Sequence, residues 1–127
     1  MTREIIDPGW AWDDKFSLSQ AVKVGNILYI SGQIALDPEG NIVDKDDIRA
    51  QSERVYENIE ALLKKAGGTM ENVVKITAFL TDMNRLAEYN EVRGKVFKGR
   101  HPASSTVAIT ALAFKGLLVE VEAVAYL

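Results

Sequence analysis

The chain contains no cysteine and a single histidine among its 127 residues. The absence of cysteine excludes disulfide bonds, thiolate metal ligands and a cysteine nucleophile. The lone histidine, His101, excludes every metal centre that needs several histidines, and it leaves a serine–histidine–acid triad one candidate base. A short acidic cluster, Asp44, Asp46 and Asp47, fits the capping of a helix better than a metal site. We therefore expect no bound metal.

Long apolar runs and an excess of positive charge are also missing. No segment approaches the roughly 20 apolar residues that a membrane helix requires. Glu4 and Asp7 interrupt the stretch where a signal peptide would carry its apolar core, so we expect a cytoplasmic protein that binds no membrane. Lysine and arginine number 15 against 18 aspartates and glutamates, a net charge of -3. That balance does not suit the neutralisation of phosphates, so we expect no nucleic-acid partner.

What the sequence does contain is the composition of one globular domain spanning residues 1–127. Hydrophobic residues make up 47% of the chain and charged residues 26%. These values lie within the range of compact soluble domains. The chain has no phosphate-binding glycine loop, no nucleophile elbow and no zinc-peptidase helix motif.

Hydrophobic periodicity predicts strands, helix, strand, helix and strands, in that order. The longer helix begins at Asp46 or Asp47 and stops before Gly67 and Gly68. A mixed sheet with both helices on one face is the simplest packing, which gives an α+β fold. The predicted strands cover residues 18–24, 27–36, 72–81, 105–113 and 117–126, and the predicted helices cover 46–66 and 84–98.

The face of the sheet turned away from the helices combines polar and apolar side chains. Strand alternation turns Val74, Val107, Ile109 and Ala111 toward the helices. A monomer would expose a large apolar patch on the opposite face, so we expect other subunits to cover it and a site to lie between chains. By alternation this outer face carries Tyr29, Ser31, Gln33, Lys75, Thr77, Phe79, Ser104, Thr106, Thr110, Leu112, Glu120, Glu122, Val124 and Tyr126.

Two glutamates stand out on that face. Glu120 and Glu122 lie about 7 Å apart along one side of a strand. Burying both without partners would cost several kcal/mol, so at least one needs a partner or water, unless the strand is an edge whose polar side meets solvent. If the face closes against a neighbouring subunit, Ser31, Asn90 and Thr106 converge on Glu120.

Several ordered segments together resemble the RidA/YjgF family, whose members are also called endoribonuclease L-PSP proteins. The resemblance spans about residues 3–126. It implies a chorismate-mutase-like fold and a homotrimer with its helices outside and three clefts between subunits. The matching segments are 24–26 with 30–34, 74–77 with Phe79, Asn90, 102–103 and 119–123.

The resemblance also implies an activity. Active members hydrolyse reactive enamines and imines, such as 2-imino acids, to a carbonyl product and ammonia without a cofactor. Glu120 matches the position of the family's glutamate, and the resemblance therefore implies that Glu120 is the catalytic group that transfers protons to and from water. The substrate-binding positions that it implies are Leu18, Ser31, Gly32, Asn90, Ser104 and Thr106.

Three of those positions depart from the family pattern. Ser104 stands where the family has an arginine that binds the substrate carboxylate, Thr106 replaces a frequent cysteine, and Leu18 replaces a tyrosine. Charge-assisted hydrogen bonds contribute about 1.5–3 kcal/mol each, so their loss predicts a substrate other than the standard short 2-imino acid. Another cation could restore the charge, the candidates being Arg100, Lys75, Lys23 and Arg93.

Two other functions remain open at this point. The chain could be a trimer that binds a small metabolite without turning it over. It could also be an endoribonuclease, although the negative net charge and lone histidine count against that. Trp10 and Trp12 could form a lid, a contact between subunits or simple edge packing.

Overall fold

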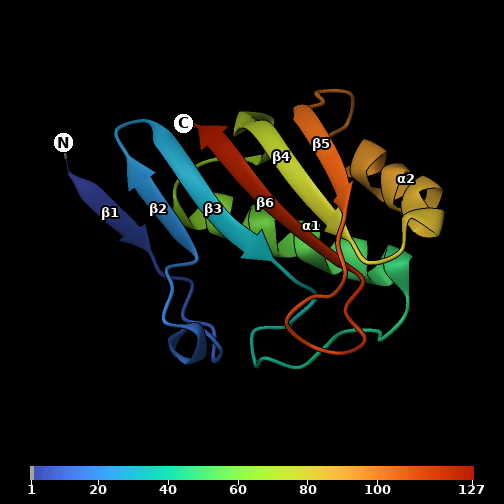
Figure 1. Ribbon diagram of the computed structural model, residues 1–127. Coiled ribbons are helices and arrows are strands. Elements are labelled where there is room, and N and C mark those ends of the chain that lie inside the picture. The colour runs from blue at the N-terminus through green and yellow to red at the C-terminus, as the bar shows by residue number, and fades with distance from the viewer. Residues whose placement is uncertain (1) are drawn as a thin grey trace.

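The computed structural model describes residues 2–127, which form one six-stranded mixed sheet and two α-helices (Figure 1). The strand order is β1-β2-β3-β6-β4-β5, with neighbours antiparallel except the parallel pair β4 and β5. The predicted α+β fold is confirmed. The elements are β1 (Arg3–Ile6), β2 (Ala21–Val24), β3 (Ile27–Gln33), α1 (Ile48–Lys65), β4 (Val73–Leu80), α2 (Leu86–Val96), β5 (Ala103–Ala108) and β6 (Val119–Tyr126).

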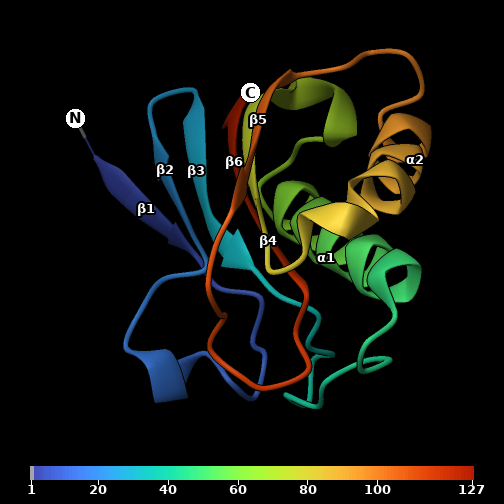
Figure 2. The ribbon, with the colours of Figure 1, turned by 45° about the vertical axis from the view of Figure 1, so that its right-hand side comes forward.

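Both helices cover the same face of the sheet, as the turned view makes plain (Figure 2). Helix α1 begins where predicted, because the Asp47 carboxylate accepts a hydrogen bond from the Ala50 amide at 3.1 Å and satisfies a donor that the first turn leaves free. It ends before Gly67, whose φ of 89° suits glycine. The core between the layers contains Ile59 and Leu62 of α1.

Helix α2 is shorter than predicted. A 3₁₀ turn over Met83–Arg85 precedes it, and the Asp82 side chain accepts a hydrogen bond from the Asn84 amide. None of the helices in the described residues is long and apolar enough to span a membrane.

A β-bulge in β3 overturns the predicted orientation of Gln33. The pairing of β3 with β6 shifts between Ile30 and Gln33, so one extra residue on β3 reverses the alternation. Gln33 is therefore 0% exposed on the helix side. Its amide donates to Gln20 Oε1 at 2.8 Å, and the Gln20 amide donates to Asp13 Oδ1 at 2.7 Å.

A second shift, between Val73 and Lys75 where β4 pairs with β6, corrects the prediction for Val74. Val73 is buried and the neighbouring Val74 is 50% exposed. The alternation of the sequence is regular here, and only the irregular pairing turns Val74 out of the core.

Strand β5 has the opposite alternation from the one predicted. Val107 pairs with Phe79, on the outer face, and is 41% exposed. Ser104 and Thr106 pair with Ile76 and Ala78, which are buried on the helix side. The prediction failed because it took apolar side chains to face the helices, whereas the outer face here is itself partly apolar. The predicted outer-face residues Thr110 and Leu112, and Ile109 and Ala111 predicted inward, lie beyond the end of β5.

The N-terminal arm packs on its own chain. Trp12 is buried in a small second cluster with Ile34, Leu36 and Leu117. The Trp10 and Trp12 rings stack with their centroids 5.4 Å apart. The Phe16 ring makes edge-to-face contacts with both Trp12 and Phe114. A lid, a contact between subunits and simple edge packing were the three roles left open for the tryptophans. Trp12 has the last of these, because it packs within its own chain.

Candidate functional site

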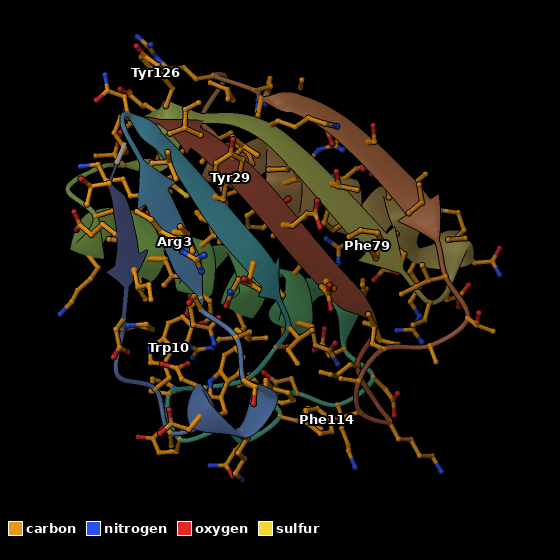
Figure 3. All side chains as sticks on the ribbon, turned by 60° about the vertical axis from the view of Figure 1, so that its left-hand side comes forward. Arg3, Trp10, Tyr29, Phe79, Phe114 and Tyr126 are labelled. Carbon is orange, nitrogen blue, oxygen red and sulfur yellow. The ribbon has the colours of Figure 1, made fainter. Side chains whose placement is uncertain are left out.

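The sheet face away from the helices presents the apolar and polar mixture predicted from the sequence. Tyr29, Phe79 and Tyr126 all lie on this side, in front of the strands in Figure 3. Tyr29 and Tyr126 are exposed, and Val107 adds a further exposed apolar side chain beside Phe79. No element of the described chain covers these residues, so the face is an open surface in a single copy.

Glu120 is the carboxylate placed most unusually on that face. It sits on β6 opposite Phe79 of β4, and its side chain lies across Gly32 of β3. A Cβ at position 32 would lie 2.7 Å from Glu120 Cδ and closer still to Oε2, so only glycine leaves room for this carboxylate.

Burial raises the pKa of Glu120, and the charge of Glu122 raises it further. Within residues 2–127, no lysine, arginine or histidine forms an ion pair with Glu120. A carboxyl group with a raised pKa and no cationic partner is suited to accept and return a proton.

Ser31 is held firmly beside this region. Its hydroxyl donates to the Ser19 carbonyl at 2.6 Å, and its amide donates to the Gln20 carbonyl at 2.9 Å. The hydroxyl proton is therefore committed, and the oxygen remains able to accept a hydrogen bond.

A broad hollow of about 690 Å³ opens over Ser31 and Leu18, and Arg3 also lines it. Arg3 is a residue that the sequence reasoning missed, because residues 3–6 were not predicted to form a strand. Its side chain lies on the same side of the sheet as Tyr29 (Figure 3). We refer to Leu18, Ser31, Gly32 and Glu120 as the sheet-face group.

The other predicted site residues form a separate group. Ser104 and Thr106 are turned toward the helix side of β5, and Arg93 Nη1 of α2 donates to Ser104 Oγ at 3.2 Å. The prediction that they share a face with Ser31 and Glu120 was therefore wrong. Asn90 lies one turn before Arg93 on α2. We refer to Asn90, Arg93, Ser104 and Thr106 as the α2–β5 group.

Asn90 leaves an unpaired acceptor. Its Oδ1 atom is buried and has no hydrogen-bond partner within residues 2–127. An unpaired buried polar atom usually costs about 1–3 kcal/mol, so it needs a reason to persist. A donor on a ligand or on another chain would remove that cost.

Among the four candidate cations, Arg93 is the one in contact with Ser104. Lys75 donates instead to Ser105 Oγ on the outer face at 3.1 Å. Arg100 forms an exposed ion pair with Glu71 at 3.6 Å. Lys23 lies on β2, and β3, β6 and β4 separate that strand from β5.

One chain therefore does not bring the seven predicted residues together. The sheet-face group and the α2–β5 group lie on opposite sides of the sheet. The single-chain structure supports neither convergence of Thr106 on Glu120 nor contact between Asn90 and Ser31.

The mixed sheet, its strand order and the one-sided helices define an α+β protein with an open sheet face. A family model described as endoribonuclease L-PSP matches residues 13–127, and the chain belongs to this family, which is the RidA/YjgF family.

Relatives and solved structures agree with this assignment. A RutC family protein of Pyrococcus abyssi is 45% identical over 99% of this chain and 98% of its own length. The crystal structure of a Rid family protein of unknown function from Yersinia pestis is 38% identical, covers 99% of this chain and 100% of its own, and has a TM-score of 0.91. RidA from an Antarctic Psychrobacter is 43% identical, with a TM-score of 0.82 over 87% of this chain and 89% of its own.

Proposed function

We propose that this protein hydrolyses a reactive enamine or imine to a carbonyl compound and ammonia, without a cofactor. We further propose that it acts as a homotrimer. Family membership supports the reaction class, and the carboxyl group of Glu120 is the single observation that carries it.

The reaction needs little beyond positioned water and a group that moves protons. An enamine first gains a proton at carbon and becomes an iminium ion. Water adds to the iminium carbon while the Glu120 carboxylate takes its proton, which gives a carbinolamine and a protonated Glu120. Glu120 then gives that proton to the amine nitrogen. As the C–N bond breaks, the Glu120 carboxylate takes the remaining hydroxyl proton, so that a carbonyl product forms, and passes it to the departing ammonia, which leaves as ammonium. Both protons of the water end on the nitrogen, and the imine carbon keeps its oxidation state, so no oxidant or reductant is required.

Glu120 meets the requirements of that role. Burial holds its pKa above the usual value, so that the protonated and ionised forms are closer in free energy near neutral pH. Gly32 fixes the carboxylate over β3, and Ser31 Oγ offers an acceptor on the same face.

A second copy of the chain supplies what one copy lacks. The α2–β5 group lies at the sheet edge formed by β5, while the sheet-face group lies on the open outer face. If β5 and α2 of one subunit pack over the outer face of the next, the two groups can meet in one cleft. The same packing covers Tyr29, Phe79, Val107 and Tyr126.

We propose that the substrate differs from the standard short 2-imino acids. Ser104 offers a neutral hydroxyl where the family pattern has a guanidinium, and Leu18 lacks the hydroxyl of a tyrosine, so the pocket is less cationic than the family pattern. A broader or longer imine therefore fits this chain better than 2-iminopropanoate or 2-iminobutanoate.

The test is an assay in which an amino-acid oxidase generates a panel of 2-imino acids with side chains of increasing size. Release of the keto acid is measured with wild-type protein, Glu120→Gln and the control Glu39→Gln, which alters an exposed turn residue. We expect acceleration by the wild type and the control, strongest for the larger imines, and a loss of about a hundredfold or more in Glu120→Gln. Equal release with Glu120→Gln and wild type would refute the proposed role of Glu120.

A further inference from the structure

A groove runs between α1 and α2 on the surface of the helix layer. The two helices lie side by side against the same face of the sheet (Figure 2). One hollow of about 320 Å³ lies between α1, Met70 and the end of α2. A second hollow, of about 290 Å³, continues along the two helices, and Glu53 and Val96 line both. We refer to the two hollows together as the helix groove.

The floor of the helix groove is apolar and is held in place by the core. Val92 and Val96 lie one turn apart on α2, and Met70 adds a third apolar side chain. Tyr56 also lines the groove, although it is only 2% exposed, and its ring packs edge-to-face on Phe97 with the centroids 5.5 Å apart. A floor that is already fixed loses little conformational freedom when a partner binds.

The two walls of the helix groove carry opposite charges. Glu53, Glu57 and Glu60 are exposed along α1, and their spacing of four and three residues places them in one row. Lys95 on α2 and Lys98 just after it are exposed on the other side. The groove therefore has an acidic wall on α1 and a basic wall along the end of α2.

Most of these wall charges have no partner in the chain. Apart from Glu57, which pairs with Arg54 at 3.3 Å, none of the five forms an ion pair within residues 2–127. Arg49 also lines the groove, but it pairs with Glu88 and Glu91 of α2. Like charges one turn apart weaken a helix, and opposite charges on a partner would relieve that repulsion.

The length of the helix groove indicates what kind of partner fits it. Residues 49–60 of α1 border it, which corresponds to about 17 Å, or three helical turns. A third helix can lie in a groove of this kind with its apolar stripe on the floor. Successive glutamates of the row are about 6 and 4.5 Å apart along α1, which matches a helix better than the spacing of about 6.8 Å on one face of a strand.

We propose that the helix groove is a docking site for an amphipathic helix of another protein. That helix places an apolar stripe on the floor, basic side chains against the glutamates of α1, and acidic side chains against Lys95 and Lys98. Unlike charges on the two sides of an apolar stripe also select partners in coiled coils. The proposal does not depend on imine hydrolysis, because Glu120 lies on the opposite face of the sheet.

Designed peptides test this charge pattern. Three fluorescein-labelled peptides of about 21 residues, long enough to form a helix, share leucines at the a and d positions of each heptad. One has lysine on one flank of the leucine stripe and glutamate on the other, the second has lysine on both flanks, and the third has glutamate on both. Fluorescence anisotropy measures binding at peptide concentrations too low for self-association. We expect the wild type to bind the mixed peptide about five- to fiftyfold more tightly than the other two.

Reversing the charge of one wall should change which peptide is preferred. Glu53→Lys/Glu60→Lys makes both walls basic, so we expect this variant to bind the glutamate-flanked peptide most tightly. Lys95→Glu/Lys98→Glu makes both walls acidic, so we expect it to prefer the lysine-flanked peptide. A change of preference in each direction is a result that loss of folding cannot produce.

Glu4→Lys/Glu39→Lys is the matched control, because it makes the same change of net charge at exposed positions outside the groove. It should keep the wild-type preference. Equal binding of the three peptides by the wild type, or an unchanged preference in both groove variants when circular dichroism shows them folded, would overturn the proposal. Sedimentation of the wild type as larger assemblies than Glu53→Lys/Glu60→Lys would assign the groove to a second copy of the chain and would also overturn it.

Discussion

The position of the Glu120 carboxylate depends on the absence of a side chain at residue 32. Gly32→Ala would place a methyl group against Glu120 Cδ and Oε2 and force the carboxylate away from β3. A displacement of about 1 Å can lower a rate about a hundredfold, and we expect kcat/KM to fall by that order. The unfolding midpoint should change little, because the displaced atoms are the end of a flexible side chain. Unchanged kcat/KM in a folded Gly32→Ala protein would contradict this account of the site.

The raised pKa of Glu120 also has a consequence for stability. A carboxyl whose pKa is higher in the folded state than in the unfolded state binds more protons when folded. Its contribution is therefore most favourable at low pH, and it declines as pH rises from the unfolded pKa of about 4.3 through the raised folded value. Glu120→Gln removes the ionisable group. We expect it to be more heat-stable than wild type at pH 7 and to lose this advantage near pH 4.

Thermal unfolding followed by circular dichroism at several pH values measures that difference. Glu39→Gln is the control, since Glu39 is an exposed turn residue. A Glu120→Gln protein less stable than wild type at pH 7 would show that the carboxylate is stabilised by its surroundings, contrary to the burial described above.

At the scale of elements, helix α2 contains a glycine that its own stability does not require. Gly94 lies within Leu86–Val96, and a Cβ built there meets no atom within 4 Å. Glycine inside a helix is less favourable than alanine by about 0.5–1 kcal/mol. We expect Gly94→Ala to raise the free energy of unfolding by about that amount, as measured by urea denaturation. Destabilisation would mean that the space beside Gly94 is filled in the native assembly.

The helices and strands other than β1 could be predicted from the sequence, whereas the irregularities in strand pairing could not. Helix α1 follows from apolar spacing and its Asp47 cap, because a helix depends on local signals. The reversal at Gln33 comes from a bulge, which is a property of two paired strands and leaves no mark in the period of one. Val74 escapes prediction for the same reason.

The site was predictable to the extent that local pattern and family resemblance determine it. Glu120 and Ser31 lie on the outer face as expected, whereas Ser104 and Thr106 do not. Strand alternation states which residues share a face but not which face that is. Which of the two faces packs against the helices must then be inferred from the side that is more apolar. That inference fails for β5, because β5 is an edge strand with little burial on either side.

At the scale of the whole molecule, an open face and a divided set of polar residues have one explanation. Tyr29, Val107 and Tyr126 are exposed and would be buried by a second subunit on this face. The sheet-face group would form a complete site only together with the α2–β5 group. Both conditions are met if copies of the chain pack in a ring, as in the proposed trimer. A closed ring of identical subunits gives every subunit the same two contacts.

The central claim, that each site joins Glu120 of one copy to the α2–β5 group of another, which includes Arg93, is tested most directly by mixing two variants. Glu120→Gln and Arg93→Gln carry different tags, are expressed together in equal amounts, and are purified through both tags to isolate mixed assemblies. If sites form between copies of a trimer, about a third of the interfaces in the doubly purified mixed assemblies pair an intact Glu120 with an intact Arg93. We predict that the mixture regains roughly that fraction of wild-type turnover, well above either variant alone. Mixed assemblies no more active than the separate variants would contradict the account.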